Sequence, residues 1–280
     1  MKMISPVRPS PIAGSWYPED KAALRKTIQG YMDQAAPSTV EGSLYGLIAP
    51  HAGYFYSGAT AGYAYRCVQG LSFDVCVVLS PLHEFQPFDL LTSSHTAYAT
   101  PLGEIPIAAD LVEEIDRDLQ TSAGLLLQRI GNDGEHSLEI QLPFLQVALK
   151  DAFQLVPIMV RTHTASSLQA AARSIYKALV GKRALIVAST DLSHFYAQAT
   201  AIKLDRVMTG RFTAFDPIGV LDAEAHQEGF ACGAGAIALA LWTTQLMGAT
   251  RITLLHHSTS ADASGDTSRV VGYAAAAITG

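Results

Sequence analysis

Short apolar runs alternate along the chain with segments of helical pattern. The apolar runs predict strands over residues 44–49, 75–79, 89–92, 154–160, 184–188, 252–255 and 270–278. The segments between them predict helices over residues 20–34, 59–68, 108–119, 137–149, 166–180, 199–215 and 235–247. Strands that alternate with helices in this way are typical of a layered α/β domain.

The predicted elements follow one another without a break that would divide the chain. The 280 residues contain no internal repeat, no low-complexity tract and no linker rich in Pro, Gly or Ser. Pro18, Glu19 and Asp20 make a good start for the first helix, because acidic side chains stabilise its positive end. We therefore predict one domain over residues 1–280.

Composition indicates a folded chain and excludes some partners. Hydrophobic residues make up 49% and charged residues 16%, so the chain can bury a sizeable core. The formal net charge of −6 offers no basic surface to nucleic acid or to an acidic membrane. Cys67, Cys76 and Cys232 show no paired spacing, which argues against a disulfide framework and favours the reducing cytoplasm.

Residues 230–250 carry no charge and are nominally long enough to span a bilayer. This stretch contains three glycines, three threonines and a glutamine, and no basic cluster flanks it. We interpret it as a helix buried inside an α/β protein. The first residues also lack the apolar region of a signal peptide, so we expect neither a membrane anchor nor secretion.

Polar side chains directly follow three of the predicted strands. His51 follows the first strand in GLIAPHAGYFYSG, His83 and Glu84 follow the second in SPLHEF, and Asp191 and His194 follow the fifth in STDLSHFY. In open α/β sheets, ligands bind outside the carboxyl ends of the strands, where loops converge. We therefore predict that these side chains form one functional site.

The same side chains are of the types that bind first-row transition metals, namely imidazole, carboxylate and thiolate. Three protein ligands with open positions would make a catalytic site, and four would make a closed structural one. Cys232, in EGFACGAGA, stands at the start of the uncharged helix, where the helix N-terminus favours a thiolate. Alternatively, it packs as a small buried hydrophobic residue.

A further cluster lies in DGEHSLEIQLPFL. His136 and Glu139 are three residues apart, so on a helix they would share one face and could bind a metal. Alternatively, Asp133 and Ser137 belong to a cap that fixes the entry to the helix. The spacing alone does not separate these interpretations.

Several common motifs are missing or stand in the wrong context. The sequence contains no P-loop, no HExxH and no G-x-S-x-G. Residues 233–238 resemble a dinucleotide fingerprint, but a helix-like stretch precedes them instead of a strand. Of His256 and His257, at most one can join a given site, because adjacent strand residues face opposite ways. His163 and His226 are predicted to lie at the surface.

Six segments occur in the order found in the MEMO family, which in prokaryotes is also called AmmeMemoRadiSam system protein B. They are IAGSWYP, IAPHAGYFYSG, SPLHE, DGEHSLEIQLPFL, ASTDLSH and CGAGAI, and the likeness runs from about Pro11 to VVGYAAAAI near the end. The resemblance implies a single three-layer α/β domain with a central mixed, largely parallel sheet. This fold would be like that of class III extradiol dioxygenases, the non-heme iron enzymes that open catechol rings.

The resemblance also implies roles for individual residues. His51, His83 and Cys232 match the family's metal ligands, and Asp191 and His194 match the polar pair beside them. The family often has serine and histidine where this chain has Leu82 and Glu84, so Glu84 could itself reach the site. A thiolate replaces the glutamate of the ring-opening dioxygenases, which shifts the metal preference toward copper or zinc.

Three functions are compatible with these residues. The first is a non-heme iron(II) (or copper) redox enzyme acting on an unknown small substrate, with His194, oriented by Asp191, as general acid or base. The second is a zinc-dependent hydrolase or lyase that uses the same ligands. The third is a non-catalytic adaptor that binds a peptide or partner in the cleft, as animal family members are described to do.

Two tyrosines and the gene neighbourhood complete the expectations. Tyr54 and Tyr56 follow His51 closely and could line the pocket, or they could pack in the core. In prokaryotes, genes of the family tend to stand beside those of an AMMECR-family protein and a radical-SAM protein. The resemblance thus implies a functional link to these two proteins.

Overall fold

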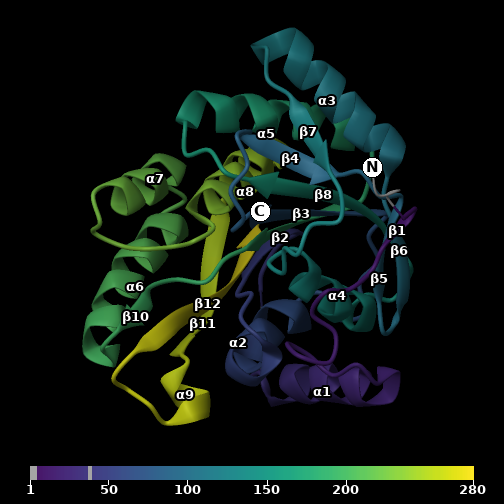
Figure 1. Ribbon diagram of the computed structural model, residues 1–280. Coiled ribbons are helices and arrows are strands. Elements are labelled where there is room, and N and C mark those ends of the chain that lie inside the picture. Colours follow the sequence, from purple (N-terminus) through teal and green to yellow (C-terminus); the bar gives the residue numbers. More distant parts are fainter. Residues whose placement is uncertain (1–4, 37–39) are drawn as a thin grey trace.

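Four parallel strands form the centre of the main sheet in a computed structural model that describes residues 5–36 and 40–280. They are β2 (Leu44–Ala49), β9 (Ala184–Ser189), β3 (Val75–Pro81) and β8 (Gln154–Val160), side by side in that order (Figure 1). Every residue of β3 and β9 is buried. Such continuous apolar runs are expected where helices cover both faces of a sheet.

Antiparallel strands extend this centre on both sides. Beyond β2 lies β12 (Val270–Thr279), which pairs with β11 (Arg251–Thr259) and with the short β10 (His194–Tyr196). Beyond β8 lie β4 (Leu90–Ser93) and β7 (Leu127–Ile130). A separate sheet of the described residues contains β1 (Val7–Arg8), β5 (Ala97–Thr100) and β6 (Gly103–Pro106). The expectation of a mixed sheet with a parallel centre is confirmed.

Helices cover the main sheet on both faces (Figure 1). On one face lie α3 (Ala109–Ala123), α5 (Ala165–Leu179) and α8 (Ala234–Met247), and on the other α1 (Lys21–Gln34), α2 (Tyr54–Arg66) and α4 (Leu142–Ala148). Near β10–β12 lie α6 (Gln198–Thr213), α7 (Pro217–Ala225) and the short α9 (Ala261–Ser264). The chain is thus an α/β domain, as predicted.

Helix α8 contains most of the uncharged stretch, and ten of its fourteen residues are buried where it packs against the sheet, α5 and α7. Within the described residues, no helix is both long and apolar enough to cross a membrane. Cys67, Cys76 and Cys232 are all free thiols.

Three predicted helices differ from the structure by four residues or more, and the first of them is α3, which ends at Ala123 and not at residue 119. Helix α2 begins at Tyr54, five residues before the predicted start at residue 59, because its glycine- and tyrosine-rich first turns are stabilised by packing against α1. The predicted helix over residues 137–149 is instead a 3₁₀ turn, η1 (Glu139–Gln141), followed by α4. Pro143 stands in the first turn of α4, since it has no N–H to continue a preceding helix.

Candidate metal centre

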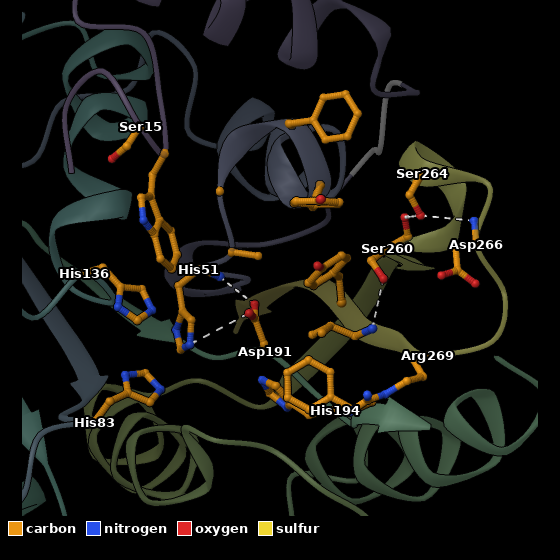
Figure 2. Close-up of a pocket in the computed structure, with 18 residues that line it drawn as sticks. Ser15, His51, His83, His136, Asp191, His194, Ser260, Ser264, Asp266 and Arg269 are labelled. Atoms are coloured by element: carbon orange, nitrogen blue, oxygen red, sulfur yellow. Dashed lines mark hydrogen bonds and ion pairs between the residues drawn. The ribbon is translucent and has the colours of Figure 1, made fainter. Parts of the chain in front are cut away.

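Three strand exits meet at one edge of the main sheet. Strands β2, β9 and β3 are adjacent and parallel, and each is followed two residues later by a polar side chain, respectively His51, Asp191 and His83. All three line a cleft with a volume of about 710 Å³ (Figure 2), and so does His194. The predicted convergence of these strand-end residues in one cleft is therefore present in the structure.

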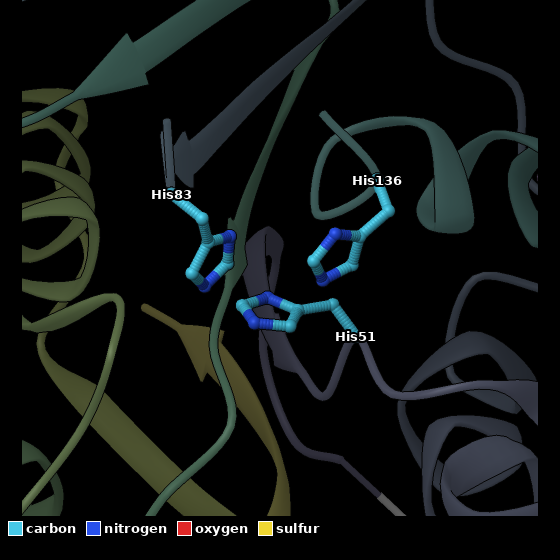
Figure 3. A group of neighbouring side chains, drawn as sticks. All are labelled: His51, His83 and His136. Atoms are coloured by element: carbon cyan, nitrogen blue, oxygen red, sulfur yellow. The ribbon is translucent and has the colours of Figure 1, made fainter. Parts of the chain in front are cut away.

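A third imidazole joins His51 and His83 at the floor of this cleft. His136 comes from the loop between β7 and η1, and the three rings converge (Figure 3). One nitrogen of each lies within 4.8 Å of one nitrogen of the other two. Three imidazoles that present nitrogens to one point could hold a divalent metal ion and leave positions open toward the cleft.

Hydrogen bonds fix the tautomer of His51 in a form that suits a ligand. Its Nδ1 lies 3.0 Å from the hydroxyl of Ser189, which donates its own proton to the carbonyl of Ser137 at 2.6 Å. The Ser189 oxygen must therefore accept a hydrogen bond from the Nδ1–H of His51. This leaves a lone pair on Nε2, the atom available to a metal.

The carboxylate of Glu135 orients His83 and the loop that carries His136. It lies 3.0 Å from His83 Nδ1 and accepts hydrogen bonds from the backbone amides of His83, His136 and Ser137. Burial opposes ionisation, but these bonds, above all that with His83, lower the pKa of Glu135. An ionised carboxylate at Nδ1 directs the Nε2 lone pair of His83 toward the cluster, as carboxylates behind metal-binding histidines commonly do.

The electrostatics keep two of the rings neutral. Burial, and then the neighbouring His136 and His83, lower the pKa of His51 well below its ordinary value. Burial likewise lowers the pKa of His136 to about 4. Hydrogen bonding to Glu135 instead raises the pKa of His83. His51 and His136, as neutral imidazoles, can bind a divalent cation without first releasing a proton.

Two further titratable groups, Asp191 and His194, face the cleft. Asp191 accepts a hydrogen bond from the His51 amide at 2.7 Å, and burial raises the pKa of its carboxyl to about 7. His194 is bonded through Nδ1 to the carbonyl of Leu192 at 2.7 Å, and burial lowers its pKa. The expectation that Asp191 orients His194 is therefore wrong, because a backbone carbonyl does so and Asp191 holds the His51 segment.

Comparison with known proteins identifies the family. A family model described as Memo-like protein matches residues 8–277. The chain belongs to the Memo family. A MEMO1 family protein of Methanothermobacter thermautotrophicus is 34% identical over 280 residues, which cover 96% of this chain and 99% of that protein. A MEMO1 family protein of Methanopyrus kandleri is 33% identical, over 94% of this chain and 96% of that protein. A MEMO1 family protein of Nitrosopumilus maritimus is 29% identical, over 96% of this chain and 98% of that protein.

Cys232, implied as the third metal ligand by the Memo resemblance, lies next to His51. Its sulfur is 3.1 Å from His51 Nε2 and 3.3 Å from the amide nitrogen of Asp191. Among the described residues, however, the group whose ligand atoms all lie close together contains three histidines without Cys232. Burial, and then Asp191, raise the pKa of its thiol, so the expected preference for a thiolate does not hold in this arrangement.

The remaining residues singled out in this Memo family member have diverse surroundings. Tyr56 lines the cleft, whereas Tyr54 is buried and donates its hydroxyl proton to the carbonyl of Ile140. Glu84 is exposed and is not among the residues that line the cleft. Glu139 does not pair with His136, since its carboxylate binds Arg8, Ser10 and Tyr17. Of these residues, only Tyr56 and His136 therefore line the cleft.

The cap proposed for the helix that follows His136 does not form, since no side chain caps η1. Asp133 binds the guanidinium of Arg8, and the Ser137 hydroxyl donates to the carbonyl of Pro81. Of the paired histidines on β11, His257 bonds to Asp205, and His256 stacks on Tyr63. Sequence reasoning missed Glu135 altogether. The only signal was its position beside His136, which does not show that its carboxylate turns back to His83.

Proposed function

We propose that this Memo family protein is a non-heme metalloenzyme whose divalent ion is held by His51, His83 and His136. The observation that carries the proposal is the convergence of three imidazole nitrogens within 4.8 Å at the floor of a cleft of about 710 Å³. Hydrogen bonds to Ser189 and Glu135 preorganise two of the rings. A cleft of this size accommodates a small molecule above the metal.

Iron(II) is the ion that we expect first, with copper or zinc as alternatives. Imidazole binds all three metals, and a mixed set of imidazoles and a carboxylate is typical of non-heme iron(II) oxygenases. Asp191 lies outside the group of three converging imidazoles but close to it, since its Oδ2 is 4.0 Å from His51 Nε2. Bound iron(II) would supply one-electron redox chemistry and a Lewis-acid position for an oxygen-bearing substrate.

His194 is the residue that we expect to move a proton. Its Nδ1 is bonded to a backbone carbonyl, which places the lone pair of the neutral ring on Nε2. Because burial lowers its pKa, the ring stays neutral at physiological pH and can accept a proton from a substrate hydroxyl. Asp191, with a pKa raised to about 7, would hold or release a second proton beside it.

Elemental analysis of protein purified without oxygen and without an affinity tag tests the proposal. We expect about one equivalent of iron in the wild type and in His226→Ala, which alters an exposed histidine, and little in His136→Ala. Cys232→Ala separates the two ligand sets, because it should keep its metal if the three imidazoles suffice. No metal in the wild type, even after reconstitution with iron(II), would refute the proposal. Zinc in a protein indifferent to dioxygen would favour a hydrolase or lyase.

A second candidate is a binding protein that uses the same cleft. Phe55 and Phe195 line the cleft with 68% and 62% of their surfaces exposed, and Tyr56 lies beside them. Exposed aromatic side chains around a cleft are suited to a peptide or an aromatic ligand. Under this alternative, His51→Ala would lose metal but would bind the partner as tightly as the wild type.

A further inference from the structure

Arg8 is a buried cation directly behind the loop that carries His136. It belongs to the two-residue strand β1 and is only 1% exposed, which makes it one of the largest fully buried side chains among the described residues. A buried guanidinium is costly unless all its partners are in place. The hydrogen-bond partners of the Arg8 guanidinium therefore indicate which part of the structure this side chain stabilises.

The hydrogen-bond partners of Arg8 all come from the segment that presents His136, and its guanidinium also lies over the ring of Tyr98, 4.9 Å from the centroid. Nη2 donates to the carbonyl of Glu135 at 2.7 Å and to the carboxylate of Asp133 at 2.7 Å. Nη1 donates to the carboxylate of Glu139 at 2.5 Å. One side chain thus binds the loop before His136, the residue adjacent to it and the 3₁₀ turn after it.

The same N-terminal segment contacts this loop at two more points. Ser10 and Tyr17 donate hydrogen bonds to the other oxygen of Glu139. The indole of Trp16 packs on the His136 ring, with the ring centroids 4.2 Å apart. The segment from Arg8 to Tyr17 therefore binds the loop through the hydrogen bonds of Arg8, and it contacts the ring of His136 through Trp16.

We propose that Arg8 is a positioning residue for the metal centre, which fixes Glu135 and His136 in the geometry that binds the ion. The inference rests on the proposed function. Arginine suits this role because its rigid fork presents several donors in fixed directions, so it can bridge two carboxylates and a carbonyl at once. Lysine at this position has the same charge but only a single donor nitrogen, and it would leave one or more of these acceptors unpaired.

A titration with Co²⁺, followed by the visible absorption of the bound ion, tests this role in the untagged full chain. We expect Arg8→Lys to weaken Co²⁺ binding about tenfold or more and to change the spectrum of the bound ion, because residues behind metal ligands typically have this effect. Asp133→Asn, which keeps the shape but removes one charge of the network, is the milder second variant. Asp133→Asn should also lower the affinity for Co²⁺. It keeps the test possible if Arg8→Lys does not fold.

Ile115→Ala provides the control for general loss of stability. Ile115 is buried in α3, which packs against α5, and it is not among the residues that line the cleft. This variant should lose thermal stability and keep the affinity and spectrum of the wild type. Wild-type affinity in folded Arg8→Lys and Asp133→Asn would overturn the positioning role. Absence of Co²⁺ binding in the wild type would instead refute the proposed metal site, and this inference with it.

Discussion

Phe195 has a backbone φ of +64°, a conformation that bulky residues rarely adopt. It stands in β10, where the register against β12 shifts between His194 and Tyr196. Its ring lines the cleft beside His194, and the guanidinium of Arg269 lies 5.4 Å from the ring centroid. Strained residues of this kind tend to cluster at functional sites, where the surrounding structure maintains them.

The strain at Phe195 can be measured by comparing two substitutions. Both Phe195→Gly and Phe195→Ala remove the ring, but only glycine adopts positive φ without a steric penalty. We therefore expect Phe195→Gly to have a free energy of unfolding about 1 kcal/mol higher than that of Phe195→Ala. Urea denaturation of the two variants measures the difference. Equal or greater stability of the alanine variant would contradict the presence of strain.

At the scale of elements, the cleft wall formed by α2 depends on close packing between α1 and α2. Gly58 and Gly62 on α2 face Tyr31 of α1. A Cβ atom at residue 62 would lie 2.5 Å from the carbonyl oxygen of Tyr31, which belongs to the backbone and cannot rotate away. Helix α2, whose first turn carries Tyr56 into the cleft, therefore packs on α1 through a contact that leaves no room for a side chain at residue 62.

Substitution of two helical glycines should have opposite effects on stability. Gly62→Ala should lower the free energy of unfolding by about 1–3 kcal/mol, because α1 must shift to accommodate the methyl group. In α6, a Cβ atom added at Gly210 would have no atom within 4 Å. Gly210→Ala should therefore raise the free energy of unfolding by about 0.5–1 kcal/mol, since alanine is the better helix former. Denaturant unfolding of both variants provides the comparison, and a stabilised Gly62→Ala would show that the two helices are not in close contact there.

At the scale of the whole molecule, the strand pattern predicted much of the cleft. The apolar runs that became β2, β3 and β9 are buried on both faces, so their pattern was clear, and their parallel order brings His51, His83 and Asp191 to one edge. The short strands β1, β5, β6, β7 and β10 and the four-residue helix α9 were not predicted, and neither was the nine-residue helix α7. The strands and α9 are runs of two to four residues, which carry too little periodicity to be recognised.

The groups that complete the site depend on contacts between distant parts of the chain. Glu135 reaches His83 across 52 residues, and Arg8 reaches Asp133 across 125. Nothing local to Glu135 or Arg8 predicts these partners, because residues 133–136 have neither helical nor strand pattern. The shape of this segment comes from buried hydrogen bonds that only the folded chain brings together.

Because the three imidazoles come from segments far apart in the sequence, a bound metal should stabilise the entire domain. A ligand that binds only the folded state, at 100 times its Kd, adds about 2.7 kcal/mol to the free energy of unfolding. For a chain of this size, that corresponds to a rise in Tm of about 5 °C.

Thermal unfolding followed by circular dichroism, with and without Zn²⁺, should show this rise in the wild type and in His226→Ala. His136→Ala should show almost none, because two imidazoles bind the ion much more weakly than three. An equal rise in His136→Ala would place the stabilising ion at another site.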